Sequence, residues 1–204
     1  MDKKLFKKNI LGYLEEWSYL GETITDLGTR LIGHRPDIAP EAYINIICPV
    51  LENSEILELA SKFQMPVSEQ YIEFLSHANG LNVFSGTLRV FGYIPPSKKT
   101  IFGLHDKPPT LMFTKEKKHS KEREKSEIVV AWYNDGSYVK LNYEGKAIRF
   151  NISEDIRLDE WEDFDTWLSS EIEILNKKYK TGKIEFFNPL LRRTQKSNEW
   201  NKKD

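Results

Sequence analysis

The chain has 204 residues, 39% of them hydrophobic and 30% charged, so it can bury a core and is not disordered by composition. Its 30 basic and 31 acidic residues nearly cancel, which argues against a protein whose whole surface is built for nucleic acid. Cys48 is the only cysteine, which excludes an internal disulfide framework and indicates a reducing compartment.

The sequence carries no signal for export or for membrane insertion. Glu15 and Glu16 interrupt the N-terminal segment where a signal peptide would have its apolar core. No apolar run approaches the roughly 20 residues that are needed to span a bilayer. We therefore expect a cytoplasmic protein that does not engage a membrane.

Residues 1–49 are predicted to form a helical extension. The apolar residues of the stretch 5–31 recur at helical spacing, and Gly21 and Gly28 divide or bend it, so one helix and two helices fit the pattern equally well. Residues 34–40 contain two prolines and are typical of a linker.

Two helices and a strand are predicted next. One helix begins near Asn53, which suits an N-cap. The second runs from Pro66 to Ala78 and ends at Asn79-Gly80, because both residues tolerate the left-handed conformation that closes a helix. Residues 87–93 then read as a strand. The apolar face of the first helix is formed by Ile56, Leu59, Ala60 and Phe63.

A long irregular insert precedes the second half of the sheet. Residues 94–127 contain two Pro-Pro pairs, and their last part, 115–127, has six basic and four acidic residues and no apolar anchor, so we expect a mobile loop. From residue 128 three strands follow as an antiparallel meander that ends at Phe150. Its first turn contains Asp135-Gly136, the favoured pair for a tight hairpin.

The last predicted element is a helix over residues 162–179, followed by a polar, basic tail over 181–204. Helices segregated from an antiparallel sheet define the α+β class. We therefore predict a sheet made of the meander plus one or more further strands, flanked by helices, with the N-terminal helical extension. The apolar side of the last helix comprises Phe164, Leu168, Ile172, Leu175 and Tyr179.

Several short motifs occur in a fixed order along the chain. They are a Met65-Pro66 step, a Tyr71-x-x-Phe74-Leu75 helix, Asn79-Gly80, a strand ending at Gly92, an Asp135-Gly136-Ser137 hairpin and a Phe164-x-x-Trp167-Leu168 helix. This pattern, over roughly residues 50–176, resembles the SUKH superfamily, which groups bacterial immunity proteins with a fungal cell-wall regulator. The resemblance implies a SUKH-like α+β domain over residues 50–180.

The resemblance also implies a function. We expect an immunity protein that binds and neutralises a cognate polymorphic toxin, such as a nuclease, through protein–protein contacts. The alternative is a regulatory or scaffolding protein of the same fold that acts on an endogenous partner, because fold does not settle function. A nucleic-acid binder using the basic 115–127 loop is a third possibility, but the near-neutral net charge counts against it.

The sequence shows no set of residues for catalysis. The histidines at 34, 77, 105 and 119 lack metal-ligand spacing, and Cys48 lies in an apolar run that suits a small core residue. A nucleophile elbow and a phosphate-binding loop are both absent. We expect no enzymatic activity, no cofactor and no bound metal.

The densest charge feature is acidic. Residues 154–173 contain nine acidic residues and one basic residue. Carboxylates near a helix N-terminus stabilise it through the helix dipole, and this structural role stands beside a binding role in which they meet a basic toxin surface. The candidate partner-binding residues, which crowd the start of the predicted last helix, are Asp159, Glu160, Glu162, Asp163 and Asp165.

Overall fold

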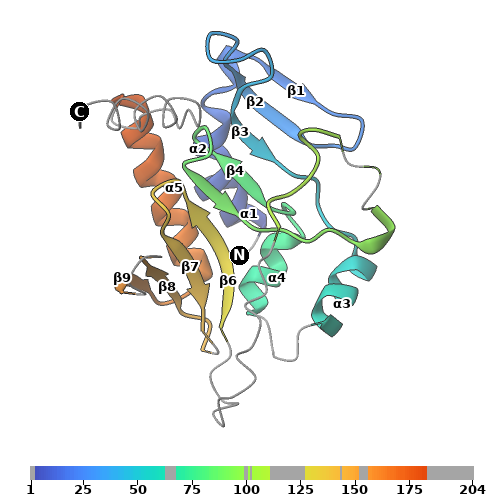
Figure 1. Ribbon diagram of the computed structural model, residues 1–204, viewed down its shortest axis with the longest axis vertical. Helices are drawn as coiled ribbons and strands as arrows, with labels where there is room; N and C mark the ends of the chain where they lie inside the picture. The colour runs from blue at the N-terminus through green and yellow to red at the C-terminus, as the bar shows by residue number, and fades with distance from the viewer. Residues whose placement is uncertain are drawn as a thin grey trace, which may run out of the picture.

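The computed structural model describes residues 3–62, 68–98, 101, 103–110, 127–142, 144–151 and 156–182. Within these residues nine strands form one antiparallel sheet, in which each strand pairs with its neighbours in the chain (Figure 1). The α+β prediction is therefore confirmed. The strands are β1 Glu22–Ile24, β2 Arg30–His34, β3 Tyr43–Ile47, β4 Leu81–Val83, β5 Leu88–Val90, β6 Ile128–Tyr133, β7 Tyr138–Leu141, β8 Ala147–Phe150 and β9 Arg157–Trp161.

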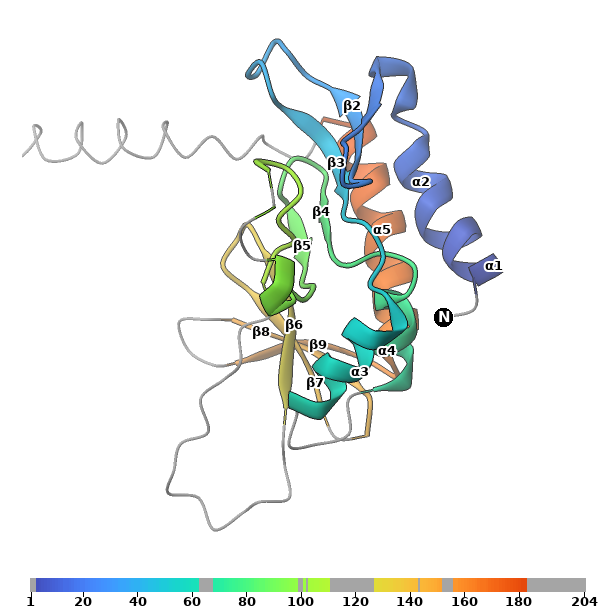
Figure 2. The same ribbon diagram turned by 90° about the vertical axis from the view of Figure 1, so that its right-hand side faces the viewer.

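The α-helices gather on one side of the sheet, where α5 lies beside the N-terminal helical segment (Figure 2). That segment is continuous, because α1, η1 and α2 follow one another without a break in right-handed helical dihedrals. None of the described helices is both long and apolar enough to cross a membrane. The helices are α1 Lys3–Phe6, η1 Lys7–Leu11, α2 Gly12–Glu15, η2 Ser18–Leu20, α3 Asn53–Lys62, α4 Glu69–Leu75, η3 Pro96–Lys98 and α5 Phe164–Lys180.

The core lies between α5, α4, the N-terminal segment and the covered face of the sheet. All five residues predicted for the apolar side of α5 are buried. Trp167 is buried with them, and its Nε1 donates a hydrogen bond to the Tyr133 hydroxyl of β6 at 3.0 Å. The predicted meander is also confirmed, with Val139 and Leu141 buried against this core and Lys140 on the other face. The alternation of β7 thus gives the sheet one packed face and one open face.

The Asn79-Gly80 motif joins the end of α4 to the sheet. The Asn79 side chain donates from Nδ2 to the Tyr93 carbonyl at 2.8 Å and accepts from the Tyr93 backbone N–H at 2.7 Å. The chain at Gly92 passes so close that a Cβ there would lie 2.2 Å from the Asn79 carbonyl oxygen. These motif residues therefore have a structural role, as the sequence indicated for Asn79 and Gly80.

The predicted N-terminal extension is helical only as far as Leu20. Helix is wrong for the following stretch, because residues 22–47 form β1, β2 and β3 of the sheet. Gly21 and Gly28, the two positions predicted to divide or bend this stretch, have φ of +113° and +89°, and the segments that follow them are strands instead of a second helix. Ile24, one of the residues that carried the helical spacing, is 63% exposed.

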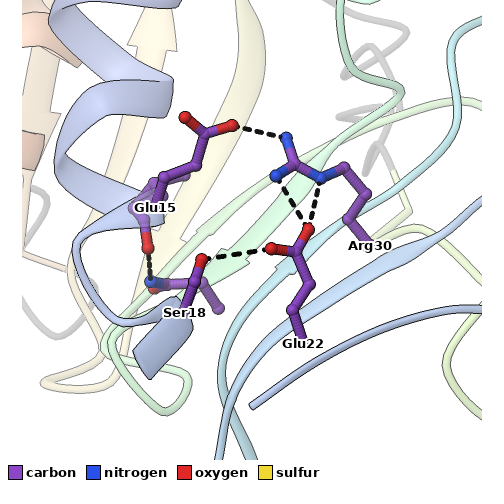
Figure 3. Close-up of polar contacts among 6 residues, drawn as sticks. Glu15, Ser18, Glu22 and Arg30 are labelled. Atoms are coloured by element: carbon purple, nitrogen blue, oxygen red, sulfur yellow. Dashed lines mark hydrogen bonds and ion pairs between the residues drawn. The ribbon is translucent and has the colours of Figure 1, made fainter. Parts of the chain in front are cut away.

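An ion-pair cluster ties the helical segment to these strands (Figure 3). The Arg30 guanidinium of β2 lies 2.8 Å from a carboxylate oxygen of Glu15 in α2 and 2.8 Å from one of Glu22 in β1. Ser18 donates a hydrogen bond to the second oxygen of Glu22 at 3.1 Å. Arg30 thus neutralises two carboxylates that would otherwise repel each other.

Smaller differences concern the middle of the chain. Ala60 is exposed and does not join the predicted apolar face of α3; the buried acidic residue of that helix, Glu55, pairs with Lys98 at 2.6 Å. Strand β5 is shorter than the predicted 87–93, because Tyr93 bonds to Asn79 instead of continuing the ladder. The predictions for Phe63, Met65-Pro66, most of the 94–127 insert and the tail from 183 lie outside the described residues.

Candidate functional site on the open face of the sheet

The open face is the side of the sheet opposite the core, where the described chain places no α-helix (Figure 2). Cross-strand pairing sets one residue from each of six consecutive strands side by side on this face. The alternate residues of the same strands, among them Val83, Val90 and Val139, are buried in the core. The open-face row runs Ile46, Asn82, Arg89, Trp132, Tyr138 and Phe150.

Half of the open-face row is aromatic. The rings of Trp132 and Tyr138 stack with centroids 5.9 Å apart, and those of Tyr138 and Phe150 with centroids 5.8 Å apart. The Lys140 ammonium lies 4.6 Å from the centroid of Phe150 and 3.2 Å from a Glu127 carboxylate. The rings therefore face one another across the strands, and all three side chains remain half-buried on a face without a helix.

A pocket of about 700 Å³ opens between the row and residues 103–110. Asn82, Arg89 and Trp132 line its sheet side, and Leu104 and Lys107 line its loop side. The size falls in the range of ligand pockets. No carboxylate lies among the described lining residues, so the pocket is cationic and partly apolar.

The loop side is held in place by Asp106. Its buried carboxylate accepts hydrogen bonds from the Thr25 hydroxyl and, at 3.3 Å, from the Gly103 backbone N–H. The neighbouring His105 lines the pocket and packs edge-on against Tyr43, with ring centroids 5.6 Å apart. His105 and Asp106, which form no recognisable motif in the sequence, thus shape one wall of the pocket.

The β4–β5 hairpin positions Asn82 and Arg89 as direct cross-strand partners. Its turn contains left-handed Phe84 and Ser85, with φ of 50° and 56°. The Phe84 backbone N–H donates to the Asn45 side chain at 3.0 Å, and the Ser85 hydroxyl lies 3.1 Å from the Tyr179 hydroxyl of α5. The surrounding core therefore holds a strained turn next to the pocket, as is common beside functional sites.

Two cationic side chains of the pocket have no partner in the described part of the chain. Neither Arg89 nor Lys107 makes a hydrogen bond or an ion pair there, although both are exposed. The Asn82 Oδ1 atom is buried and has no hydrogen-bond partner in the described part of the chain. Because guanidinium groups bind carboxylates and phosphates well, the pocket is suited to an anionic ligand.

Cys48 lines the pocket but is 2% exposed. Burial, assisted by the charge of Asp106, raises the pKa of the Cys48 thiol to about 12. The thiol therefore stays protonated at neutral pH and is a poor nucleophile. Among the described residues no group of His, Cys, Asp or Glu side chains could hold a metal ion.

The predicted acidic site is divided by the structure. Asp159 and Glu160 belong to the edge strand β9, which pairs with β8, and Glu162 follows it in the turn before α5. All three are exposed. Glu160 is paired with Arg157 and lies 3.6 Å from Lys146. The three carboxylates lie together at one edge of the sheet, where Glu160 already has basic neighbours, and none of them lies within the helix itself.

The other two acidic residues belong to the start of α5. Asp163 is its N-cap, accepting from the Thr166 backbone N–H at 2.7 Å, and also accepts from Gln70 of α4 at 3.2 Å. Asp165 is half-buried, and burial together with the nearby charges of Asp163 and Glu73 raises the pKa of its carboxyl. The structural role that the sequence left open therefore holds for Asp163, which caps the helix.

The sequence missed the open-face row. Arg89 was the one charged residue among apolar neighbours in the predicted strand 87–93, and alternation alone marked it as pointing away from the core. The pairing register that brings Arg89 beside Asn82 and Trp132 could not be predicted from the sequence. Comparisons of the chain with protein-family models, with curated proteins and with solved structures found no match.

Proposed function

We propose that this chain is a protein-binding protein that neutralises a cognate protein toxin by covering part of its surface, without chemistry of its own. The resemblance of its motifs to the SUKH superfamily supports the choice of a toxin as partner. The observation that carries the proposal is the aromatic part of the open-face row, Trp132, Tyr138 and Phe150, presented on a sheet face without a helix.

This surface has the composition of a binding interface. Trp, Tyr and Arg are the residue types most enriched in the energetic centres of protein interfaces, and the open-face row places one of each on adjacent strands. Strands hold side chains more precisely than loops do, so little ordering entropy is lost on binding. An enzyme would instead need convergent reactive groups, and the open face offers stacked rings and cations.

The charges along this face differ between its two ends. Arg89 and Lys107 make the pocket end cationic, whereas Asp159, Glu160 and Glu162 make the β9 edge acidic. Opposed charges on a partner would orient it along the face during the encounter. The three exposed carboxylates thus remain our candidates for contact with a basic toxin surface.

The test begins with the neighbouring genes, where we expect a polymorphic toxin immediately upstream. The toxic domain is expressed with and without this chain, and cell growth and the Kd of the purified pair are measured. Wild-type protein should restore growth. Tyr138→Ala should weaken binding about 30-fold, which corresponds to the roughly 2 kcal/mol of an interface hot spot.

The matched control is Tyr19→Ala, since Tyr19 is 75% exposed and lies in η2, outside the open face. It should bind and protect as the wild type does. If the purified chain does not bind the toxic domain, the toxin proposal is wrong. Capture of an endogenous protein through the same Tyr138-dependent surface would point to the regulatory alternative instead.

A further inference from the structure

We infer that the pocket beside the open-face row binds an acidic peptide segment, with an Asp or Glu carboxylate held between Arg89 and Lys107. The segment would belong to the proposed partner, so the inference rests on the proposed function and names the chemistry of that partner. Both cations line the same pocket and have no partner among the described residues. A carboxylate is the anion that proteins most often offer to a guanidinium group.

The distribution of cations favours one carboxylate over a chain of phosphates. Outside the pocket, the described basic residues of the open face have carboxylate partners: Lys140 lies 3.2 Å from Glu127, and Arg157 is paired with Glu160. A polyphosphate or nucleic-acid backbone needs a continuous cationic track. Among the described residues of this face the unpaired cations lie in the pocket, which suits a single local anionic group.

The lining of the pocket favours a peptide over inorganic phosphate. Leu104 and Trp132 line it beside the two cations, so an apolar residue next to the acidic one can pack against them. Inorganic phosphate would leave these apolar side chains without contact.

The aromatic residues favour a peptide over nucleobases. The Tyr138 ring is stacked on both of its neighbours, at interplanar angles of 22° to Trp132 and 20° to Phe150. Base recognition on single strands requires exposed ring faces, and both faces of the Tyr138 ring are taken up by its neighbours. Ring edges and the Leu104 side chain, which is 82% exposed, remain for an apolar residue next to the carboxylate.

The test uses the purified full chain and two blocked peptides, acetyl-Gly-Glu-Phe-Gly-amide and its Gln counterpart, acetyl-Gly-Gln-Phe-Gly-amide. Binding is followed by NMR through the Asn82 side-chain amide and the Trp132 indole signals. We expect the Glu peptide to shift both signals and to bind at least about tenfold more tightly than the Gln peptide, because charge-assisted hydrogen bonds are about twice as strong as neutral ones.

Arg89→Gln and Lys107→Gln should each reduce the difference in Kd between the two peptides, and the double variant should bring the two peptides to the same Kd. The matched control is Arg157→Gln, a change to an open-face arginine that already has a carboxylate partner, and it should leave the difference unchanged. Equal binding of the two peptides, no shift of the pocket signals, or tighter binding of an eight-residue oligothymidylate would overturn the inference. None of these outcomes involves the toxin. The growth assay therefore tests the proposed function independently of the peptide experiment.

Discussion

The two faces of the sheet differ in how completely their polar groups are used. On the covered face Asn45 and Trp167 use their polar groups within the chain: Asn45 donates to Leu14 and accepts from Phe84, and the Trp167 indole donates to Tyr133. On the open face Asn82 Oδ1 and Arg89 have none among the described residues. Stability is therefore concentrated on one side of the sheet, and the capacity to bind is concentrated on the other.

The largest effect should come from the covered face. Phe74 is fully buried in contact with the rings of Phe6, Tyr71 and Phe164. Phe74→Ala should lower the free energy of unfolding by about 3–5 kcal/mol, because it removes buried apolar area and leaves a cavity. Phe150→Ala on the open face should cost only about 1 kcal/mol, the worth of one aromatic pair. Denaturant unfolding of both variants measures the two losses in free energy. Equal losses would show that the two faces contribute equally to stability.

Gly92 tests the junction between α4 and the sheet. Gly92→Ala should lower the free energy of unfolding by about 1–3 kcal/mol, because the new Cβ would overlap the Asn79 carbonyl and force the backbone apart. Gly12→Ala is the matched control. Gly12 is exposed in α2 with 3.7 Å to the nearest atom, so an alanine there should stabilise the protein by roughly 0.5–1 kcal/mol. Thermal unfolding of the two variants should therefore shift in opposite directions.

Glu171 gives the covered face a pH dependence. Burial raises the pKa of its carboxyl in α5, against the effect of the hydrogen bond from Tyr133 and the charge of Arg149. A raised folded-state pKa contributes stability that is present below the ordinary pKa of glutamate and is lost as the pH rises through the folded value. The advantage of Glu171→Gln over the wild type should therefore be larger at pH 7 than at pH 4. Urea unfolding at both values measures it, and an advantage that shrinks with pH would contradict the assignment.

The smallest effect on stability is expected at the β9 edge. Changing Asp159, Glu160 and Glu162 together to Lys should leave unfolding nearly unaltered, since exposed ion pairs are worth about 0–1 kcal/mol each. Association with a basic toxin should slow at low salt, and the difference should fade as salt screens exposed charges beyond about 8 Å. Stopped-flow binding at two ionic strengths decides this. If the association rate at low salt is unchanged, these carboxylates do not contact the toxin.

The parts of the fold that were predictable are those in which local chemistry decides the structure. Asp135-Gly136 specified the β6–β7 turn, with Gly136 at φ +87°, and the apolar stripe specified α5. Strand β9 was not predictable in this way, because its residues are mostly exposed and charged and their extended form depends on pairing with β8. The misassigned segment 22–31 has the same explanation, since β1 and β2 are defined by each other.

The site was less predictable than the fold. Alternation in single strands indicates which residues point away from the core, but only the cross-strand register brings Arg89, Trp132 and Asn82 together. The acidic residues that stood out by density were divided between a helix cap and an edge strand. The density of acidic residues along the sequence therefore identified a charged region of the surface, but it did not show which of these residues cap a helix and which lie at the edge of the sheet.

The order of the strands in the sheet also affects which native contacts can form while the chain is still being synthesised. Neighbouring strands pair in sequence, so each hairpin can form soon after it leaves the ribosome. The N-terminal segment is different: the Trp17 indole donates to Asn176 at 2.9 Å across 159 positions, and Asn176 donates to Glu16 at 2.7 Å. The N-terminal segment can therefore make these native contacts only after α5 has been synthesised, although it is the first part of the chain to be made.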